Sequence, residues 1–162
     1  MLTNIQIESF CTQTMIQLVD VTMKNELPPH PMQGNYIINL QSSTEGDGTH
    51  WTALLVRENM NYFFDSFGAP PSQEIVVFCA KTQNRILFNN SIIQNLHSDL
   101  CGYYCIGLLH AVGNGKDDVR DLVNDYINKF RDNTSENAGI LKSYFREWSP
   151  KNVIFNKLML CR

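Results

Sequence analysis

The sequence predicts an α+β fold in which a central mixed sheet packs against helices on one of its sides. Three segments are rich in β-branched and aromatic residues and favour strands: residues 35–40, 50–56 and 61–67. From Cys101 onward, about a dozen residues carry no formal charge, which indicates a buried helix. Two later segments, 117–130 and 135–148, show the amphipathic spacing of surface helices. The order of helix, sheet, central helix and further helices is typical of this fold class.

The size and composition of the chain limit the classes of protein to which it can belong. Its 162 residues are 43% hydrophobic, so we expect a single domain over residues 1–162 with a real core. It has no apolar run of about 18 residues and no signal pattern at its start, so we expect a soluble protein made in the cytosol. Five cysteines without a CxxC pair argue against a disulfide scaffold and a structural zinc site. A formal net charge of −3 gives no signal for nucleic-acid binding, and we expect no cofactor and no membrane association.

The first element should be a helix over residues 3–11, because Thr3 or Asn4 can cap its N-terminus. Ile5 and Phe10 are among its apolar positions, and we expect both to face the core. Together these features predict a short helix that packs on the rest of the domain.

The turn residues define the elements that follow. The segment 57–60 suits a hairpin turn, so the strands on either side should be antiparallel neighbours. The glycine-bearing polar segment 41–48 has the composition of a loop, which we expect to border and gate the active-site cleft. We also expect an extended proline-rich segment at 26–31, a helix at 74–81 capped near Ser72, and strands at 85–88 and 91–93.

Cys101 lies where the chemistry of a helix would make a thiol reactive. Ser98 and Asp99 are good N-cap residues, so the helix should begin close to Cys101. The free N–H groups at a helix N-terminus stabilise a thiolate and lower the pKa of a thiol placed there. Gly102 leaves room beside it for a substrate backbone. Cys101 is therefore a candidate nucleophile, provided that a base and an orienting acid lie elsewhere in the chain.

The predicted hairpin supplies both partners. Counting back from its turn, His50 and Asp65 lie roughly opposite each other, where an imidazole and a carboxylate can share a hydrogen bond. The second ring nitrogen could then accept the proton of Cys101 and form a thiolate–imidazolium pair. Gln94 lies seven residues before the cysteine, and its amide could donate to an oxyanion together with the Cys101 N–H. Trp51 could cover the imidazole and keep water away from it.

These residues, in this order, resemble a known protease superfamily. The set consists of His50-Trp51, the sequence Phe-Asp-Ser-Phe-Gly at 64–68, Gln94 and Cys101-Gly102. It is similar to the superfamily of the adenovirus maturation protease (adenain) and the SUMO-specific proteases, and the resemblance spans residues 35 to about 112. The Phe-Gly ending, the spacing from Gln to Cys and the Leu-His-Ala end of the apolar segment resemble the adenain branch. The short chain resembles the compact proteases of large DNA viruses, virophages and related mobile elements.

The resemblance implies a papain-like, circularly permuted fold and a cysteine endopeptidase activity. His50 would act as base and then acid, Asp65 would orient it, and Gln94 would line the oxyanion hole. The enzyme would cut viral capsid or core precursor polypeptides after glycine or another small residue during virion maturation. It would be a monomer that acts in the host-cell cytoplasm during assembly and is packaged in the virion.

The adenain branch includes activation by a peptide and by DNA. An activating peptide stays open as a partner here, whereas the acidic composition argues against DNA. Cys79 lies roughly where that family can carry the cysteine that binds its activating peptide. The sequence around Cys79 does not match well enough for that role to be transferred.

Other reactive side chains have simpler interpretations. Cys105 is one helical turn after Cys101 and is the rival nucleophile, but it lies inside the apolar segment and should be buried. His97 is too close in sequence to Cys101 to give the geometry of a base. His110 near the end of the helix should be structural. We assign no catalytic role to His30, Cys11, Cys161, Asp117 and Asp118.

Three alternative functions remain open at this point. The same triad could process ubiquitin-like modifiers in a host cell. The fold could be a catalytically inactive module that binds peptides, although the intact His50, Asp65 and Cys101 argue against this. The acyl-enzyme could instead pass an acetyl group to an amine, although no basic cluster for the phosphates of acetyl-CoA is evident.

Overall fold

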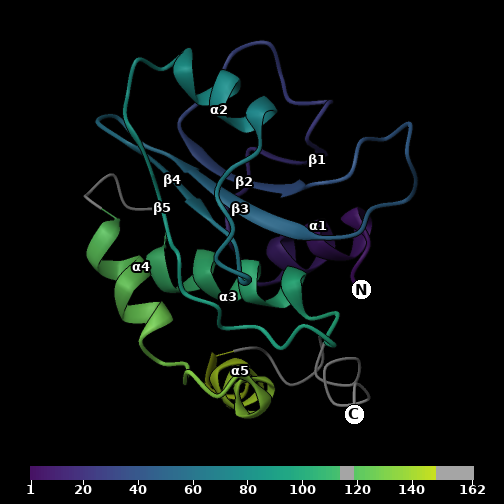
Figure 1. Cartoon of the computed structure of the whole chain (residues 1–162), viewed down its shortest axis with the longest axis vertical. Helices are drawn as coiled ribbons and strands as arrows, with labels where there is room; N and C mark the ends of the chain where they lie inside the picture. Colours follow the sequence, from purple (N-terminus) through teal and green to yellow (C-terminus); the bar gives the residue numbers. More distant parts are fainter. Residues whose placement is uncertain (114–118, 149–162) are drawn as a thin grey trace.

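A computed structural model describes residues 1–113 and 119–148 of the chain. Within these residues, five strands form one sheet in the order β1-β2-β3-β4-β5 (Figure 1). The outer pairs β1/β2 and β4/β5 are parallel, and the inner pairs β2/β3 and β3/β4 are antiparallel. The predicted α+β class with a mixed sheet is therefore confirmed. The strands are β1 (Asp20–Met23), β2 (Gly34–Asn39), β3 (Trp51–Val56), β4 (Asn61–Phe64) and β5 (Ile86–Phe88).

The β3–β4 hairpin has the predicted turn and fixes the register of the strands that flank the site. The Arg57 N–H donates to the Met60 carbonyl at 2.9 Å and closes the turn. Ala53 pairs with Phe64 across the hairpin. At the open end of the hairpin, one strand begins directly after residue 50 and the other ends directly before residue 65. His50 and Asp65 therefore lie next to each other's strands, at the same end of the hairpin.

The helices cover both faces of the sheet, so the prediction that they lie on one side is wrong. In Figure 1, α2 (Gln73–Ala80) lies above the sheet and α3 (Cys101–Val112) lies below it. Strands β2, β3 and β4 are buried on both faces, and both faces must be shielded from water. Side chains that alternate along these strands therefore contribute to two separate cores. The core under α2 contains Tyr36, Ile38, Leu54, Val56, Phe63, Ile75, Phe78 and Cys79.

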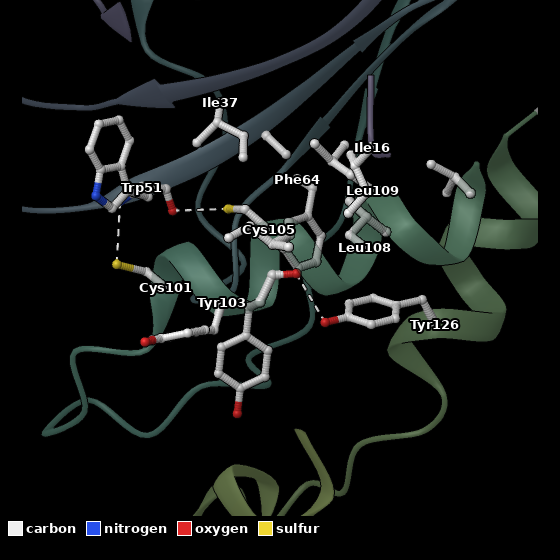
Figure 2. Packing of buried hydrophobic residues seen from close by; sticks show 14 of the residues in the cluster. Ile16, Ile37, Trp51, Phe64, Cys101, Tyr103, Cys105, Leu108, Leu109 and Tyr126 are labelled. Atoms are coloured by element: carbon white, nitrogen blue, oxygen red, sulfur yellow. Dashed lines mark hydrogen bonds between the residues drawn. The ribbon is translucent and has the colours of Figure 1, made fainter. Parts of the chain in front are cut away.

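The central helix α3 is enclosed by the sheet and by the helices on that side. Ten of its twelve residues are buried, which explains why its sequence is apolar on all sides. α1 (Asn4–Gln13), α4 (Arg120–Ile127) and α5 (Asn137–Trp148) contribute to the same core. The Tyr126 hydroxyl of α4 donates to the Tyr104 carbonyl at 2.9 Å and ties the two helices together (Figure 2).

Several local predictions differ from the structure. Phe10 faces the core as expected, together with Ile7 and Cys11, but Ile5 lies on the opposite side of α1 and is 71% exposed. The segment 91–93 is not a strand: the Ile93 and Gln94 N–H groups donate to the Ser66 carbonyl at 2.9 and 3.0 Å in an irregular loop.

The ends of two helices also differ from their predicted positions. The helix α3 has Leu100 at its N-cap, so neither Ser98 nor Asp99 caps it. Asp99 instead pairs with the α-amino group of Met1. A 3₁₀ turn at Thr134–Glu136 precedes α5, which therefore begins later than predicted. The N-cap of α1 is Thr3, one of the two expected residues, and its side chain accepts from the Gln6 N–H at 3.3 Å.

Some expectations concern residues outside the described part of the chain or the association with a membrane. The predicted start of the helix at 117, the Asp117–Asp118 pair and Cys161 lie outside the described residues. Among the helices that are described, none combines the length and the apolar character that crossing a bilayer requires.

Candidate functional site

Cys101 is the first residue of α3 and lies against the start of β3. The backbone N–H of Trp51 donates to its Sγ atom at 3.4 Å (Figure 2). A helix N-terminus and a directed N–H group both favour negative charge on the sulfur. The predicted position of Cys101 at a helix start is therefore confirmed, although the N-cap residue differs.

His50 lies immediately before β3, at the edge of the sheet that faces Cys101. Its backbone carbonyl accepts from the Leu40 N–H at 2.9 Å, which continues the ladder with β2 by one step. Its Nε2 lies 2.7 Å from Asp65 Oδ1. Its ring stacks on Phe67, with 4.7 Å between the ring centroids. The imidazole is thus held on one edge by a carboxylate and on one face by an aromatic ring.

Asp65 is a buried carboxylate with a fixed orientation. It is 1% exposed, and its Oδ1 also accepts from the Phe67 N–H at 2.8 Å. Asn89 binds both backbone groups of Asp65: Asn89 Oδ1 accepts from the Asp65 N–H at 2.9 Å, and Asn89 Nδ2 donates to the Asp65 carbonyl at 2.7 Å. A buried carboxylate requires such partners. Here they also aim it at His50.

The surroundings of His50 favour its protonated form. Burial on its own would lower the pKa of His50, but side-chain hydrogen bonds with Asp65 and Cys101 raise the pKa from 6.5 to about 9. Because Nε2 is engaged by Asp65, Nδ1 is the ring nitrogen left for the sulfur. The structure therefore brings the three residues together as predicted, with His50 between Asp65 and Cys101.

The other described cysteines lack such surroundings. Burial raises the pKa of Cys11 and of Cys79 to about 12, and it raises the pKa of Cys105 well above its ordinary value. The Cys105 thiol donates to the Trp51 carbonyl at 3.4 Å from inside the core (Figure 2). The thiolate is the nucleophilic form of cysteine, so these three positions favour an unreactive thiol.

Gln94 lies in the loop before α3 and is 1% exposed. Its Oε1 accepts from the Ser66 hydroxyl at 2.7 Å, and its Nε2 donates to the Ser98 carbonyl at 2.8 Å. The amide therefore ties the loop that follows β4 to the loop that precedes the cysteine. A primary amide carries two N–H groups, so one N–H of Gln94 remains beside the one that binds Ser98.

Gly102 and Trp51 pack against the N-terminal segment. The Trp51 indole N–H donates to the Leu2 carbonyl at 2.8 Å. A Cβ atom added to Gly102 would lie 3.2 Å from the Leu2 side chain and 3.4 Å from the indole of Trp51. The space beside Gly102, which we expected to be open to substrate, is filled by these side chains in the structure.

The remaining histidines lie apart from this arrangement. The Nδ1 atom of His110 lies 2.8 Å from the Tyr144 hydroxyl, its ring stacks on Trp148, and burial lowers its pKa. This agrees with a structural role in its neutral form. His97 is exposed on the loop before α3. Within residues 1–113 and 119–148, no group of three or more His, Cys, Asp or Glu side chains is arranged to hold a metal ion.

Sequence reasoning missed the residues that hold the carboxylate and the imidazole in place. Asn89 follows β5, where an asparagine is typical of a turn. No spacing in the sequence links it to Asp65. Phe67 was part of the Phe-Gly motif, but its stacking on His50 depends on the tight turn after β4, in which the Gly68 N–H donates to the Asp65 carbonyl at 2.9 Å. Gly68 has a φ of +69°, which favours glycine at that turn.

The chain is similar to solved structures of one viral protease. No protein-family model matches the chain, and no curated protein matches it. Two crystal structures of the ASFV pS273R protease are similar to it, one of them of the selenomethionine form. The TM-scores are 0.46 and 0.47, the sequence identities are 19% and 14%, and the matches cover 70% and 81% of this chain. They cover 43% and 67% of those chains, so this chain spans less than half of the first.

Proposed function

We propose that this protein is a cysteine endopeptidase with Cys101 as nucleophile, His50 as base and acid, and Asp65 as the residue that orients His50. The observation that carries the proposal is the placement of one imidazole between a buried carboxylate and the sulfur at the head of α3. The raised pKa of His50 favours imidazolium beside thiolate, the resting state of thiol proteases. The order of motifs, which resembles adenain and the SUMO-specific proteases, supports the same activity.

The residues can perform peptide hydrolysis in two balanced steps. The Cys101 thiolate attacks the peptide carbonyl carbon, and the imidazolium of His50 gives its proton to the amine that leaves, which forms an acyl-enzyme. Neutral His50 then takes a proton from water, whose oxygen attacks the thioester and releases the acid. His50 finally holds the proton beside the regenerated thiolate. Asp65 keeps the ring in one orientation in both steps.

The oxyanion in both steps would receive hydrogen bonds from the Cys101 N–H and from the second N–H of Gln94. One such donor is typically worth about 2 to 4 kcal/mol of barrier. Gln94→Glu would keep the acceptor for Ser66 and replace the donor with a carboxylate. We expect it to lower kcat by about 10²-fold or more, with a smaller change in KM.

The proposed substrates are viral capsid or core precursor polypeptides that are cut at small-residue, glycine-containing sites during virion maturation. This finer assignment rests on the resemblance of the motifs to the adenain branch. From the same resemblance we propose that the enzyme is a monomer and that a peptide can activate it. We also propose that it acts in the host cytoplasm and is packaged in the virion.

A covalent probe tests the proposed nucleophile. A glycine-containing peptide vinyl sulfone should label Cys101 in the native protein, and tryptic mass spectrometry should find the adduct on that residue alone. Cys105→Ser is the matched control, and we expect it to keep both labelling and cleavage. Cleavage that survives Cys101→Ala would contradict the proposal.

A second experiment tests the substrate class. Particle proteins are incubated with the enzyme and with Cys101→Ala, and new termini are identified by mass spectrometry. Cuts after small residues in structural precursors support the viral assignment. Cuts only in a ubiquitin-like fusion, acetyl transfer from acetyl-CoA, or peptide binding without any cut would replace it with the corresponding alternative.

A further inference from the structure

A cavity of about 510 Å³ lies beside Trp51 at the β1 edge of the sheet. Three segments form its walls: β1 with the turn after it, the start of α1, and the loop that leads from β2 to residue 50. The residues that matter for its chemistry are Val21, Met23, Glu26, Ser43, Asp47 and Trp51. None of Cys101, His50 and Asp65 lines the cavity, but Trp51, the residue that follows His50, does.

Trp51 connects the cavity to the sulfur. Its side chain lines the cavity, and its backbone N–H contacts Cys101 Sγ at 3.4 Å. An extended peptide advances by about 3.3 Å per residue. A peptide with its carbonyl at Cys101 would thus carry a side chain into this cavity within a few residues of the scissile bond.

The walls of the cavity are held in place by the protein itself. Asn25 and Ser43 exchange two hydrogen bonds of 3.0 and 2.9 Å, which join the turn after β1 to the loop opposite. Asn39 Oδ1 accepts from the N–H groups of Gln41 and Thr49, at 3.0 and 3.2 Å, and so holds both ends of that loop. The cavity is therefore present before a ligand binds, which reduces the ordering cost of binding.

The lining suits a long cationic side chain. Val21 and Trp51, which are 7% and 3% exposed, form the apolar floor of the cavity. The half-buried Met23 offers apolar surface to an alkyl stem, and the exposed Glu26 and Asp47 offer carboxylates to a charged head. Among the described residues, neither carboxylate has an ion-pair or hydrogen-bond partner. The neighbouring Lys24 does not neutralise them, because it pairs with Glu74 at 3.3 Å.

One feature of the lining opposes a cation. The N-terminus of α1 faces the cavity through residues 3 and 4, and a helix N-terminus carries partial positive charge. The capping box between Thr3 and Gln6 satisfies two of the backbone N–H groups at that end. Two full negative charges therefore outweigh about half a positive charge.

We propose that this cavity is a substrate subsite that selects a lysine or arginine side chain near the scissile bond. The inference rests on the proposed peptidase function, because it assumes that a peptide carbonyl reaches Cys101. Glu26 and Asp47 are specificity-determining residues for that side chain, and Met23 packs along its stem above the floor formed by Val21 and Trp51.

The test is a scan of one lysine through a glycine-containing peptide, compared at each position with glutamine. At one position we expect lysine to raise kcat/KM by about threefold to tenfold, mainly through KM, which is the size that two exposed ion pairs allow. The preference should disappear in the double variant E26Q/D47N and should shrink as salt is added. The matched control is E58Q/D132N, which removes the same charge from exposed sites outside the cavity and should keep the preference.

A binding measurement separates this inference from the peptidase proposal. The fluorescein-labelled lysine peptide and its glutamine twin are titrated with Cys101→Ala and followed by anisotropy. Tighter binding of the lysine peptide, lost in E26Q/D47N, supports the subsite even if no peptide is cut, in which case only the peptidase proposal fails. Equal cleavage and equal binding of the two peptides would overturn the subsite and leave the peptidase proposal standing.

Discussion

Replacing Asp65 with asparagine tests the electrostatic basis of the site. Asparagine has nearly the same shape, and its Oδ1 can still accept from the Phe67 N–H, but the negative charge beside His50 is lost. In the native protein the pKa of His50 is raised from 6.5 to about 9 by Asp65 and Cys101 against the effect of burial. A rise of that size corresponds to about 3 kcal/mol of preference for the imidazolium. In Asp65→Asn, burial should dominate and much of that preference should be lost.

The preference has a defined dependence on pH. Because the folded-state pKa of His50 lies above its ordinary value, its protonation stabilises the fold fully below about pH 6.5. This contribution is lost as the pH rises from 6.5 through about 9. Urea denaturation of the native protein should therefore show a free energy of unfolding that falls across this window. The same plot for Asp65→Asn should be flatter.

The reactivity of Cys101 provides the second assay. Loss of the imidazolium removes the partner of the thiolate, so the pH profile of Cys101 alkylation by iodoacetamide should shift to higher pH in Asp65→Asn. Peptidase kcat should fall by about 10²- to 10⁴-fold, as expected when the base loses its orienting carboxylate. Asp132→Asn, an exposed carboxylate far along the chain, is the control. Superimposable alkylation profiles for the native protein and a folded Asp65→Asn would refute this reasoning.

Three further substitutions test the packing of the helices and the hydrogen bonds that hold Asp65. Gly107→Ala would bring a Cβ atom to 2.6 Å from the Tyr126 hydroxyl, so we expect a loss of about 1 to 3 kcal/mol in urea denaturation. Gly139→Ala in α5 meets nothing within 4 Å and should instead stabilise by about 0.5 to 1 kcal/mol; equal effects at the two sites would contradict the packing argument. Asn89→Ala removes both hydrogen bonds to the Asp65 backbone, and we expect kcat to fall together with a loss of about 1 to 3 kcal/mol of stability. An unchanged kcat would show that the carboxylate is held without Asn89.

The sheet and the central helix were predictable because their signals are local. Alternating or continuous apolar residues define the strands, and the turn at 57–60 fixes the antiparallel register of the hairpin. That register places His50 and Asp65 at the same edge of the sheet, which is why a sequence without a structure could pair them. Cys101 was found because an uncharged segment starts abruptly after a polar loop.

The features that were missed depend on contacts between distant segments. Helix α2 covers the second face of the sheet, and nothing in its own sequence says which face it will cover. Asn89 lies 24 residues from Asp65, and only the parallel pairing of β4 with β5 brings it close. Ser98 and Asp99 have the side chains of helix caps, but Asp99 is drawn to the α-amino group of Met1, a contact across 98 positions of the chain.

The backbone of Trp51 has a consequence for how α3 moves relative to β3. Its N–H donates to the sulfur of Cys101, and its carbonyl accepts from the thiol of Cys105. Two successive turns of α3 therefore bind the same residue of β3. A sliding motion of the helix along the strand would have to break both contacts together. His50 is the residue before Trp51 in the chain. The imidazole of His50 and the sulfur of Cys101 should therefore keep their relative positions when the protein fluctuates. Substitutions elsewhere in the core should then lower the stability of the fold before they change the positions of His50 and Cys101 relative to each other.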